Sequence, residues 1–279
     1  MNILVVGSGP MGISIALSFS PFHNLSVYSR HAKLAAKNIS KQSRRYSALL
    51  KSCPLPPPQT IDIIESLENI SQFDLIIESI VEDKEAKQEV LRSLSTNAHP
   101  EAILVTNTST ISVNELSNVV IDPSRFLGCH FFNPPYHARI VEISTTSHAS
   151  TKSISSLTNI LTGSSFAYVQ LHTSPGMIVN RALFLMINEA IEMLSDDLAS
   201  EKDIDILFTT ALGHPMGPLQ LADFIGLDVC LAILTNLNSA FGKSKYAPSK
   251  LLKELVNSGH LGRKSGQGFY TYAKVSHKA

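Results

Sequence analysis

Two stretches of the sequence combine residue types that could do chemistry, and the first is rich in glycine. Gly7-Ser8-Gly9-Pro10-Met11-Gly12 follows a short apolar run and precedes an apolar stretch with helical character. In such a G-x-G-x-x-G turn the first glycine makes the tight turn, the second lets the backbone approach a pyrophosphate, and the third lets the helix pack against the strand. The helix N-terminus then points at phosphate charge. The sequence therefore predicts a dinucleotide site at Gly7, Gly9, Met11 and Gly12.

The residues after the next strand indicate which dinucleotide is bound. A carboxylate about 20 residues after the fingerprint hydrogen-bonds the ribose 2′-hydroxyl of NAD, whereas an arginine accommodates the 2′-phosphate of NADP. Here the run Leu25 to Tyr28 ends in Ser29-Arg30, with no Asp or Glu beside it. A hydroxyl and a guanidinium suit a phosphate, so we expect NADP to be preferred. The alternative is that Arg30 is a solvated surface residue and the cofactor is NAD.

The second stretch pairs a histidine with a carboxylate. A strand that contains His130 ends in a proline turn, and Ile140 to Ile143 follows as another strand. If the chain folds back at Tyr136, His130 and Glu142 become neighbours because both lie six positions from it. A carboxylate beside an imidazole fixes its tautomer and stabilises the imidazolium, as a general base for an alcohol requires. The alternative is a buried histidine with a structural role.

The elements that must position these residues alternate between short apolar runs and helical patterns. This alternation is typical of βαβ units on a parallel sheet buried on both faces. The expected strands are Asn2 to Val6, Leu25 to Tyr28, Leu75 to Glu78, Ile103 to Thr106, Phe126 to Phe132 and Arg139 to Ile143. The sequence thus predicts an α/β, Rossmann-type doubly wound domain over residues 1–173.

Past Pro175-Gly176 the strand pattern ends. We expect a long apolar helix from Met177 to about Leu194, a helix with a capping-box-like start at Ser200, and a further helix from Leu219 to about Phe241. An all-α C-terminal domain over residues 174–279 follows. Its helices carry few charges, so part of their apolar surface is expected to meet another chain.

Composition narrows the possible partners. The sequence has 23 Lys and Arg against 23 Asp and Glu, so a nucleic-acid surface is not expected. Cys53, Cys129 and Cys230 have neither metal-ligand nor disulfide-framework spacing, which argues against a metal site and fits a reducing compartment, the cytoplasm. No apolar run approaches the roughly 18 residues of a membrane span, so no membrane partner is expected.

The motifs taken together resemble the 3-hydroxyacyl-CoA dehydrogenases, particularly the short 3-hydroxybutyryl-CoA type. The resemblance runs from end to end through Gly7 to Gly12, Val81-Glu82-Asp83, Asn107-Thr108-Ser109, His130 to Pro134, Val141-Glu142, Pro175 to Arg181, Met216 to Leu219 with Asp223, and Gly266 to Tyr270. It implies a homodimer with a Rossmann-type domain and a helical dimerisation domain. It also implies that hydride passes between a nicotinamide and C3 of an acyl thioester in a cleft between the domains.

The resemblance also implies roles for individual residues. His130 would be the general base and Glu142 its orienting partner, Ser109 would hydrogen-bond the substrate oxygen, and Asn180 would complete that polar ring. The positions expected near the cofactor are Glu82, Lys87, Asn107 and Asn133, with Lys264 on a C-terminal loop that reaches the nicotinamide. Without the resemblance, Ser109 could be a turn residue, Asn180 a helix cap, and Glu82 and Lys87 a solvated helix face.

One departure from the family concerns the thioester carrier. The family usually has a long helix–turn–helix that cradles the CoA nucleotide, but here only one helix, His31 to Ser52, and the proline-rich Pro54 to Pro58 separate the second strand from Ile61. An acyl carrier protein is therefore an alternative to CoA. Its acidic surface would meet the basic residues of this segment, Lys41, Arg44, Arg45 and Lys51.

A second similarity keeps two further alternatives open. Asn133-Pro134-Pro135-Tyr136 is similar to the gulonate dehydrogenase and lambda-crystallin branch. That branch includes dehydrogenases of small polar hydroxy acids and lens proteins. The alternatives are therefore a hydroxy acid dehydrogenase or a structural protein that kept the fold and lost the chemistry.

Overall fold

The computed structural model describes residues 1–50, 56–172 and 174–272, with the side chains of residues 49 and 50 excepted. The chain divides into two units, Met1–Met177 and Ile178–Ala279, each of which is described by itself. The expected boundary after residue 173 lies four residues before this division. Lys51, Cys53 and Pro54, which the sequence analysis singled out, lie outside the described residues.

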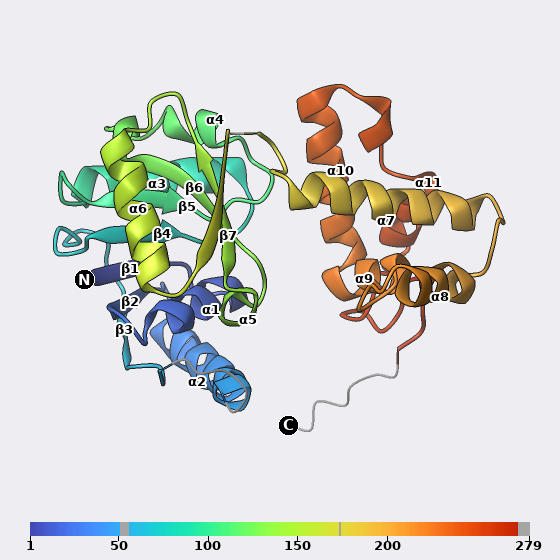
Figure 1. Ribbon diagram of the computed structural model, residues 1–279, viewed down its shortest axis with the longest axis horizontal. Coiled ribbons are helices and arrows are strands. Elements are labelled where there is room, and N and C mark those ends of the chain that lie inside the picture. The colour runs from blue at the N-terminus through green and yellow to red at the C-terminus, as the bar shows by residue number, and fades with distance from the viewer. Residues whose placement is uncertain (51–55, 173, 273–279) are drawn as a thin grey trace. The chain divides into compact units, whose positions relative to one another are not determined.

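Within the described residues the first unit contains one eight-stranded sheet (Figure 1). Its strands are β1 (Asn2–Val6), β2 (Asn24–Tyr28), β3 (Ile61–Ile64), β4 (Leu75–Glu78), β5 (Ile103–Thr106), β6 (Phe126–Phe131), β7 (Ile140–Thr145) and β8 (Ala167–His172). The spatial order is β3-β2-β1-β4-β5-β6-β7-β8, and the pairs are parallel apart from β6 with β7. The order reverses between β1 and β4, and such a reversal opens a crevice at the carboxyl ends of the strands.

Helices cover both faces of this sheet, as the apolar strands require. They are α1 (Pro10–Phe19), α2 (Ala32–Leu50), α3 (Lys84–Asn97), α4 (Val113–Ser117), α5 (Pro135–Ala138) and α6 (Thr151–Gly163). Successive strand residues point to opposite faces. Ile3 and Val5 accordingly pack in the core under α1 and α6, whereas Leu4 and Val6 pack in the core under α3 and α4. The predicted Rossmann-type fold is confirmed.

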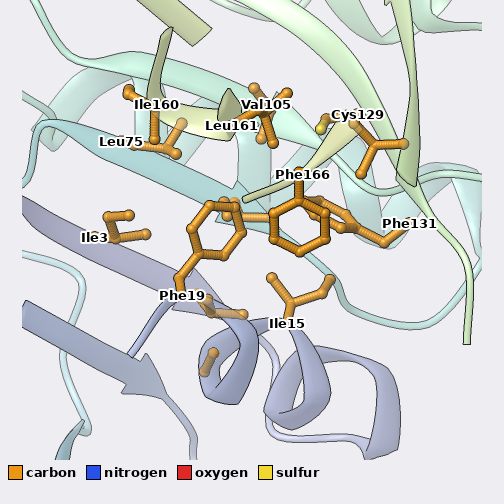
Figure 2. Packing of buried hydrophobic residues seen from close by; sticks show 14 of the residues in the cluster. Ile3, Ile15, Phe19, Leu75, Val105, Cys129, Phe131, Ile160, Leu161 and Phe166 are labelled. Carbon is orange, nitrogen blue, oxygen red and sulfur yellow. The ribbon is translucent and has the colours of Figure 1, made fainter. Parts of the chain in front are cut away.

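Three phenylalanines anchor the end of β6 in the first of these cores (Figure 2). The Phe131 ring meets Phe19 of α1 edge-on, with centroids 5.9 Å apart, and meets Phe166 edge-on at 5.6 Å. Because neighbouring strand residues face opposite ways, burial of Phe131 turns His130 away from this core. The aromatic cluster thereby fixes the strand that carries the histidine.

The second unit is helical in its described part. Its helices are α7 (Val179–Ser195), α8 (Glu201–Ala211), α9 (Pro218–Ile225), α10 (Leu227–Phe241) and α11 (Lys250–Asn257). The predicted cap at Ser200 is present, since its Oγ accepts from the Asp203 amide at 3.2 Å. Asp205 plays the same part for α9, accepting from the amides of Leu219 and Gln220 at 2.9 Å each.

Some predicted elements differ from the structure. The single helix expected from Leu219 to Phe241 is two helices, α9 and α10, bent by 98° at Gly226, where φ is +108°. Strands β3 and β8 were not predicted, because no residue of β3 is fully buried and β8 is exposed along almost its whole length, so neither gives the apolar pattern of a buried strand. Among the described residues no single helix is long and apolar enough to cross a membrane. Helices α9 and α10 reach that length and apolar character only when they are counted together, across the 98° bend between them.

Candidate active site

A pocket of about 550 Å³ lies at the carboxyl ends of the central strands. It lies within the first unit and is lined by the glycine turn, the end of β2, the segment after β4, and residues after β5 and on β6. The lining residues are Gly7, Ser8, Gly9, Pro10, Met11, Tyr28, Ser29, Arg30, His31, Ser79, Ile80, Val81, Glu82, Asn107, Ser109 and His130. The structure thus brings the fingerprint and the histidine, more than 100 positions apart in the sequence, to one pocket.

The three glycines of the fingerprint have the three predicted environments. Gly7 has φ +125°, and a Cβ there would lie 2.3 Å from the Ser79 carbonyl oxygen. A Cβ on Gly12 would lie 2.1 Å from the Gly7 carbonyl oxygen, whereas one on Gly9 would meet nothing within 4 Å. Gly9 caps α1 without a side-chain hydrogen bond, so the first amides of the helix are not covered by a cap. This open helix N-terminus fits the pyrophosphate of a dinucleotide.

Ser29 and Arg30 directly follow β2 and line the pocket together with the glycine turn. Ser29 is 4% exposed, and its Oγ lies 2.8 Å from Ser8 Oγ and accepts from the His31 amide at 3.1 Å. Arg30 is exposed and lines the pocket. Ser29 therefore joins the end of β2 to the glycine turn, and Arg30 places a positive charge at the pocket.

His130 and Glu142 are directly opposite each other on β6 and β7. His130 Nδ1 lies 2.8 Å from Glu142 Oε2, and both side chains are less than a tenth exposed. The turn at Tyr136 is the short helix α5, and the predicted pairing about this residue is confirmed. Because Glu142 engages Nδ1, Nε2 is the ring nitrogen left to exchange a proton at the pocket.

Glu82 organises the loop that follows β5. Its Oε1 accepts from Thr108 Oγ1 at 2.7 Å, from the amides of Ser109 and Thr110 at 2.8 Å each, and from Ser109 Oγ at 3.2 Å. Burial alone would raise the pKa of Glu82, but the Lys87 ammonium and these hydrogen bonds outweigh it and hold the pKa below its usual 4.5. Glu82 is thus held as a carboxylate at the pocket wall.

Asn107 connects that loop to the histidine strand. Its side-chain oxygen accepts from the Phe131 amide at 2.9 Å, and its side-chain nitrogen donates to Ser79 Oγ at 3.2 Å. Asn107 and Ser109 both line the pocket, and the contacts with cofactor and substrate that the resemblance implies for them stay predictions.

Four other predicted site residues are not among the residues that line this pocket. Lys87 does not line the pocket, because it is 1% exposed and its Nζ donates to Glu78 Oε1 at 2.7 Å. Asn133 is exposed in the turn after β6 and is also absent from the lining. Asn180 and Lys264 belong to the second unit, where Asn180 is buried in the first turn of α7 and Lys264 pairs with Asp228 at 2.5 Å.

Glu78 is a residue of this region that the sequence analysis did not single out as functional. It ends β4, is fully buried, and pairs with Lys87 behind the pocket wall. A carboxylate at the end of an otherwise apolar strand, with a lysine nine positions on, was the available signal.

Within the described ranges, no three His, Cys, Asp or Glu side chains gather so that they could hold a metal ion.

Two family models match the chain across its length. The model of the 3-hydroxyacyl-CoA dehydrogenase NAD binding domain matches residues 2–169, and that of the 3-hydroxyacyl-CoA dehydrogenase C-terminal domain matches residues 176–272. The chain belongs to the 3-hydroxyacyl-CoA dehydrogenase family. The resemblance found in the sequence motifs is thereby confirmed, and the pocket belongs to a domain that binds a nicotinamide cofactor.

Individual relatives agree with this assignment. The chain is 35% identical over 278 residues to the probable 3-hydroxybutyryl-CoA dehydrogenase of Bacillus subtilis (strain 168), with 97% of each chain covered. It is 34% identical to the 3-hydroxybutyryl-CoA dehydrogenase of Clostridioides difficile, with 98% of this chain and 100% of the relative covered. The solved (S)-3-hydroxybutyryl-CoA dehydrogenase from Ralstonia eutropha superposes with a TM-score of 0.90 at 32% identity, covering 98% of this chain and 99% of that one.

Proposed function

We propose that the protein is a dehydrogenase that interconverts a short 3-hydroxyacyl-CoA and the matching 3-ketoacyl-CoA with a nicotinamide cofactor. The observation that carries this proposal is the His130–Glu142 pair, 2.8 Å apart, in the same pocket as the dinucleotide fingerprint. An alcohol cannot give up a hydride from carbon unless its proton also leaves, so a positioned base beside the cofactor is what the reaction needs. Family membership supplies the class of substrate.

Each polar residue of the site has its own role in the proposed oxidation. A nicotinamide cofactor held at Gly7, Gly9 and Gly12 would supply the acceptor for the hydride from C3. His130 Nε2 takes the hydroxyl proton as the C3–O bond becomes a carbonyl, while Nδ1 donates to Glu142 and the carboxylate stabilises the resulting imidazolium. We propose that Ser109 and Asn180 hydrogen-bond the substrate oxygen and that Lys264 acts toward the nicotinamide, as the family resemblance implies.

A spectrophotometric assay tests the proposal. The purified protein is mixed with acetoacetyl-CoA and NADH or NADPH, and cofactor oxidation is followed by absorbance. We expect turnover of the thioester. Gulonate with NAD or NADP, read in the opposite direction, tests the small hydroxy acid alternative. Turnover of gulonate alone would reject the acyl-CoA proposal, and turnover of neither would favour a structural protein.

For the finer cofactor choice, we propose NADP over NAD. Arg30 is exposed at the pocket, and neither Ser29 nor Arg30 offers the carboxylate that would accept from a ribose 2′-hydroxyl. Binding constants for the two reduced cofactors, taken from the quenching of protein fluorescence or the enhancement of cofactor fluorescence, measure this preference. Equal affinities would show that Arg30 does not contact the 2′-phosphate.

A carrier protein remains a second candidate for the thioester carrier, and the surface of α2 favours it. Lys33, Lys37, Lys41, Arg44 and Arg45 are all exposed on this helix, which contains no acidic residue. CoA is the first candidate, because relatives named for CoA substrates match this chain over almost their whole length. Values of kcat/KM for 3-ketobutyryl thioesters of CoA, a carrier protein and pantetheine separate the two.

We further propose that the protein is a cytoplasmic homodimer assembled through its helical unit. Apolar side chains more than half exposed there include Ile206, Leu207, Leu212 and Phe224, and an unpaired surface of this kind favours association. Cys129 and Cys230 are free buried thiols, as a reducing compartment allows. Light scattering on a size-exclusion column measures the mass, and a monomer at micromolar concentration would reject the dimer.

A further inference from the structure

A fully buried ion pair lies behind the wall of the pocket. Glu78 Oε1 and Lys87 Nζ are 2.7 Å apart, and the two side chains are 0% and 1% exposed. Neither residue lines the pocket. Taking two charges out of water is costly, and well-packed apolar residues often stabilise a fold as well or better. The presence of a buried pair at this place therefore calls for a reason other than stability.

The surroundings of the pair hold Glu78 in one orientation. Its Oε1 also accepts from the Ile80 amide at 2.8 Å, and its Oε2 accepts from Thr106 Oγ1 at 2.5 Å. These contacts join the ends of β4 and β5 and use both carboxylate oxygens. The Lys87 ammonium is in this way placed at a fixed point.

Lys87 reaches a second carboxylate from that point. Its Nζ lies 3.5 Å from Glu82 Oε2. The loop after β5 donates to the other carboxylate oxygen, Oε1. That other oxygen receives the amides of Ser109 and Thr110. The contacts form a chain from the buried pair through Glu82 to the loop that carries Ser109.

We propose that Glu78 and Lys87 are positioning residues, which fix the Glu82 carboxylate and, through it, the backbone of residues 107–110 at the pocket. Lys87 acts through Glu82 in this proposal, since its Nζ lies 3.5 Å from Glu82 Oε2. The kinetic part of the proposal rests on the proposed function. The structural part, the order of the loop, does not.

A double variant separates positioning from simple stabilisation. Glu78→Gln combined with Lys87→Met removes both fully buried charges, so neither is left unpaired in the interior, and the Glu82 carboxylate that loses its lysine is 32% exposed. Glu89→Gln, an exposed carboxylate on the same helix, serves as the matched control. Glu82→Gln leaves the buried pair intact and weakens only the link to the loop, so it keeps the test valid if the double variant does not fold.

Three measurements are made on each variant: the melting temperature, hydrogen exchange of a peptide covering residues 107–111, and kcat with acetoacetyl-CoA. For the double variant we expect a melting temperature close to that of the parent protein. We expect loop exchange to become about tenfold faster, because hydrogen bonds to a charged acceptor are loosened. We expect kcat to fall by roughly tenfold or more, since small misplacements of positioning groups are costly. Glu82→Gln is expected to reproduce the loop and kcat effects, and Glu89→Gln none of them.

The outcomes that overturn the proposal differ from those that overturn the function. Parent-like loop exchange in both the double variant and Glu82→Gln would show that the network does not position the loop. A loss of melting temperature with unchanged loop exchange and kcat would assign the pair a structural role only. If the parent protein had no dehydrogenase activity, the exchange measurement would still decide whether Glu78 and Lys87 order residues 107–110.

Discussion

The two ends of the pocket are built in opposite ways. At the fingerprint end the site depends on missing side chains, since six consecutive residues supply a sharp turn, an open space at Gly9 and a close contact at Gly12. At the histidine end it depends on side chains from separate segments, such as His130 and Glu142, and Glu82 with its loop. Binding of a polyanion can thus be encoded locally, whereas proton transfer needs groups that only the tertiary fold brings together.

The largest effect is expected at the histidine end, from replacing the proposed base His130. His130→Gln should lower kcat by roughly 10²-fold or more, because positioned proton transfer contributes about that much. Cofactor affinity should barely change, since Gln can fill the same space. Steady-state kinetics and a cofactor titration measure the two effects. Loss of cofactor binding with an intact kcat would contradict the assigned role.

Removal of the orienting carboxylate should act in the same direction with a smaller effect. Glu142→Gln keeps the side-chain shape but removes the charge that stabilises the imidazolium, so kcat should fall by roughly tenfold to 10²-fold. The pH dependence of kcat supplies a second readout. A variant with parent-like kcat across pH would show that Glu142 does not assist His130.

The fingerprint end is best tested with two alanines that should behave differently. Gly12→Ala drives a Cβ into the Gly7 carbonyl, so we expect a loss of about 1–3 kcal/mol of unfolding free energy from overpacking. Gly9→Ala places its Cβ in open space and should leave stability unchanged while weakening cofactor binding by about tenfold, which corresponds to about 1.4 kcal/mol. Denaturant unfolding and cofactor titration measure both. Equal destabilisation by the two changes would contradict the separate roles.

A smaller effect is expected on cofactor choice. Arg30→Ala should weaken NADPH by roughly tenfold and leave NADH unchanged, because a hydrogen bond between charged groups contributes about 1.5–3 kcal/mol and this one is partly solvated. Ser29→Asp should shift preference toward NADH, since a carboxylate repels the 2′-phosphate. Titration of both cofactors against each variant checks the sign. An equal loss for both cofactors in Arg30→Ala would assign it no selective role.

The smallest expected effect is an acid-side change in stability. Glu82 has a folded-state pKa below its ordinary value of 4.5, so its contribution to stability is present above that pH and is lost as the pH falls through the lowered pKa. The difference in unfolding free energy between the parent protein and Glu82→Gln should therefore shrink as the pH is lowered below 4.5. A difference that stays constant across this acid range would show that Glu82 is not held as a carboxylate.

Features of the fold and of the site that depend on local patterns could be predicted from the sequence. The fingerprint and the six predicted strands are local patterns, and the His130–Glu142 pairing follows from symmetry about one turn. Glu78 was not singled out, because its partners Lys87 and Thr106 come from other elements and the carboxylate at the end of an apolar strand does not by itself identify them. The burial of Lys87 beside Glu78 was not predicted, since a motif gives the position of a lysine in the chain but not the depth at which it lies. The bend at Gly226 was missed because both flanking helices are apolar.

The antiparallel pairing of β6 and β7 makes the length of the intervening turn part of the active site. His130 and Glu142 are 12 positions apart and directly opposite each other. Insertion or deletion of a single residue in this turn would shift the register by one and carry the carboxylate to the other face of the sheet. A shift of two would keep the face but bring Ile140 or Ser144 opposite the imidazole. Natural variation in this stretch should therefore consist of replacements at constant length, whereas loops far from the pocket can grow or shorten freely.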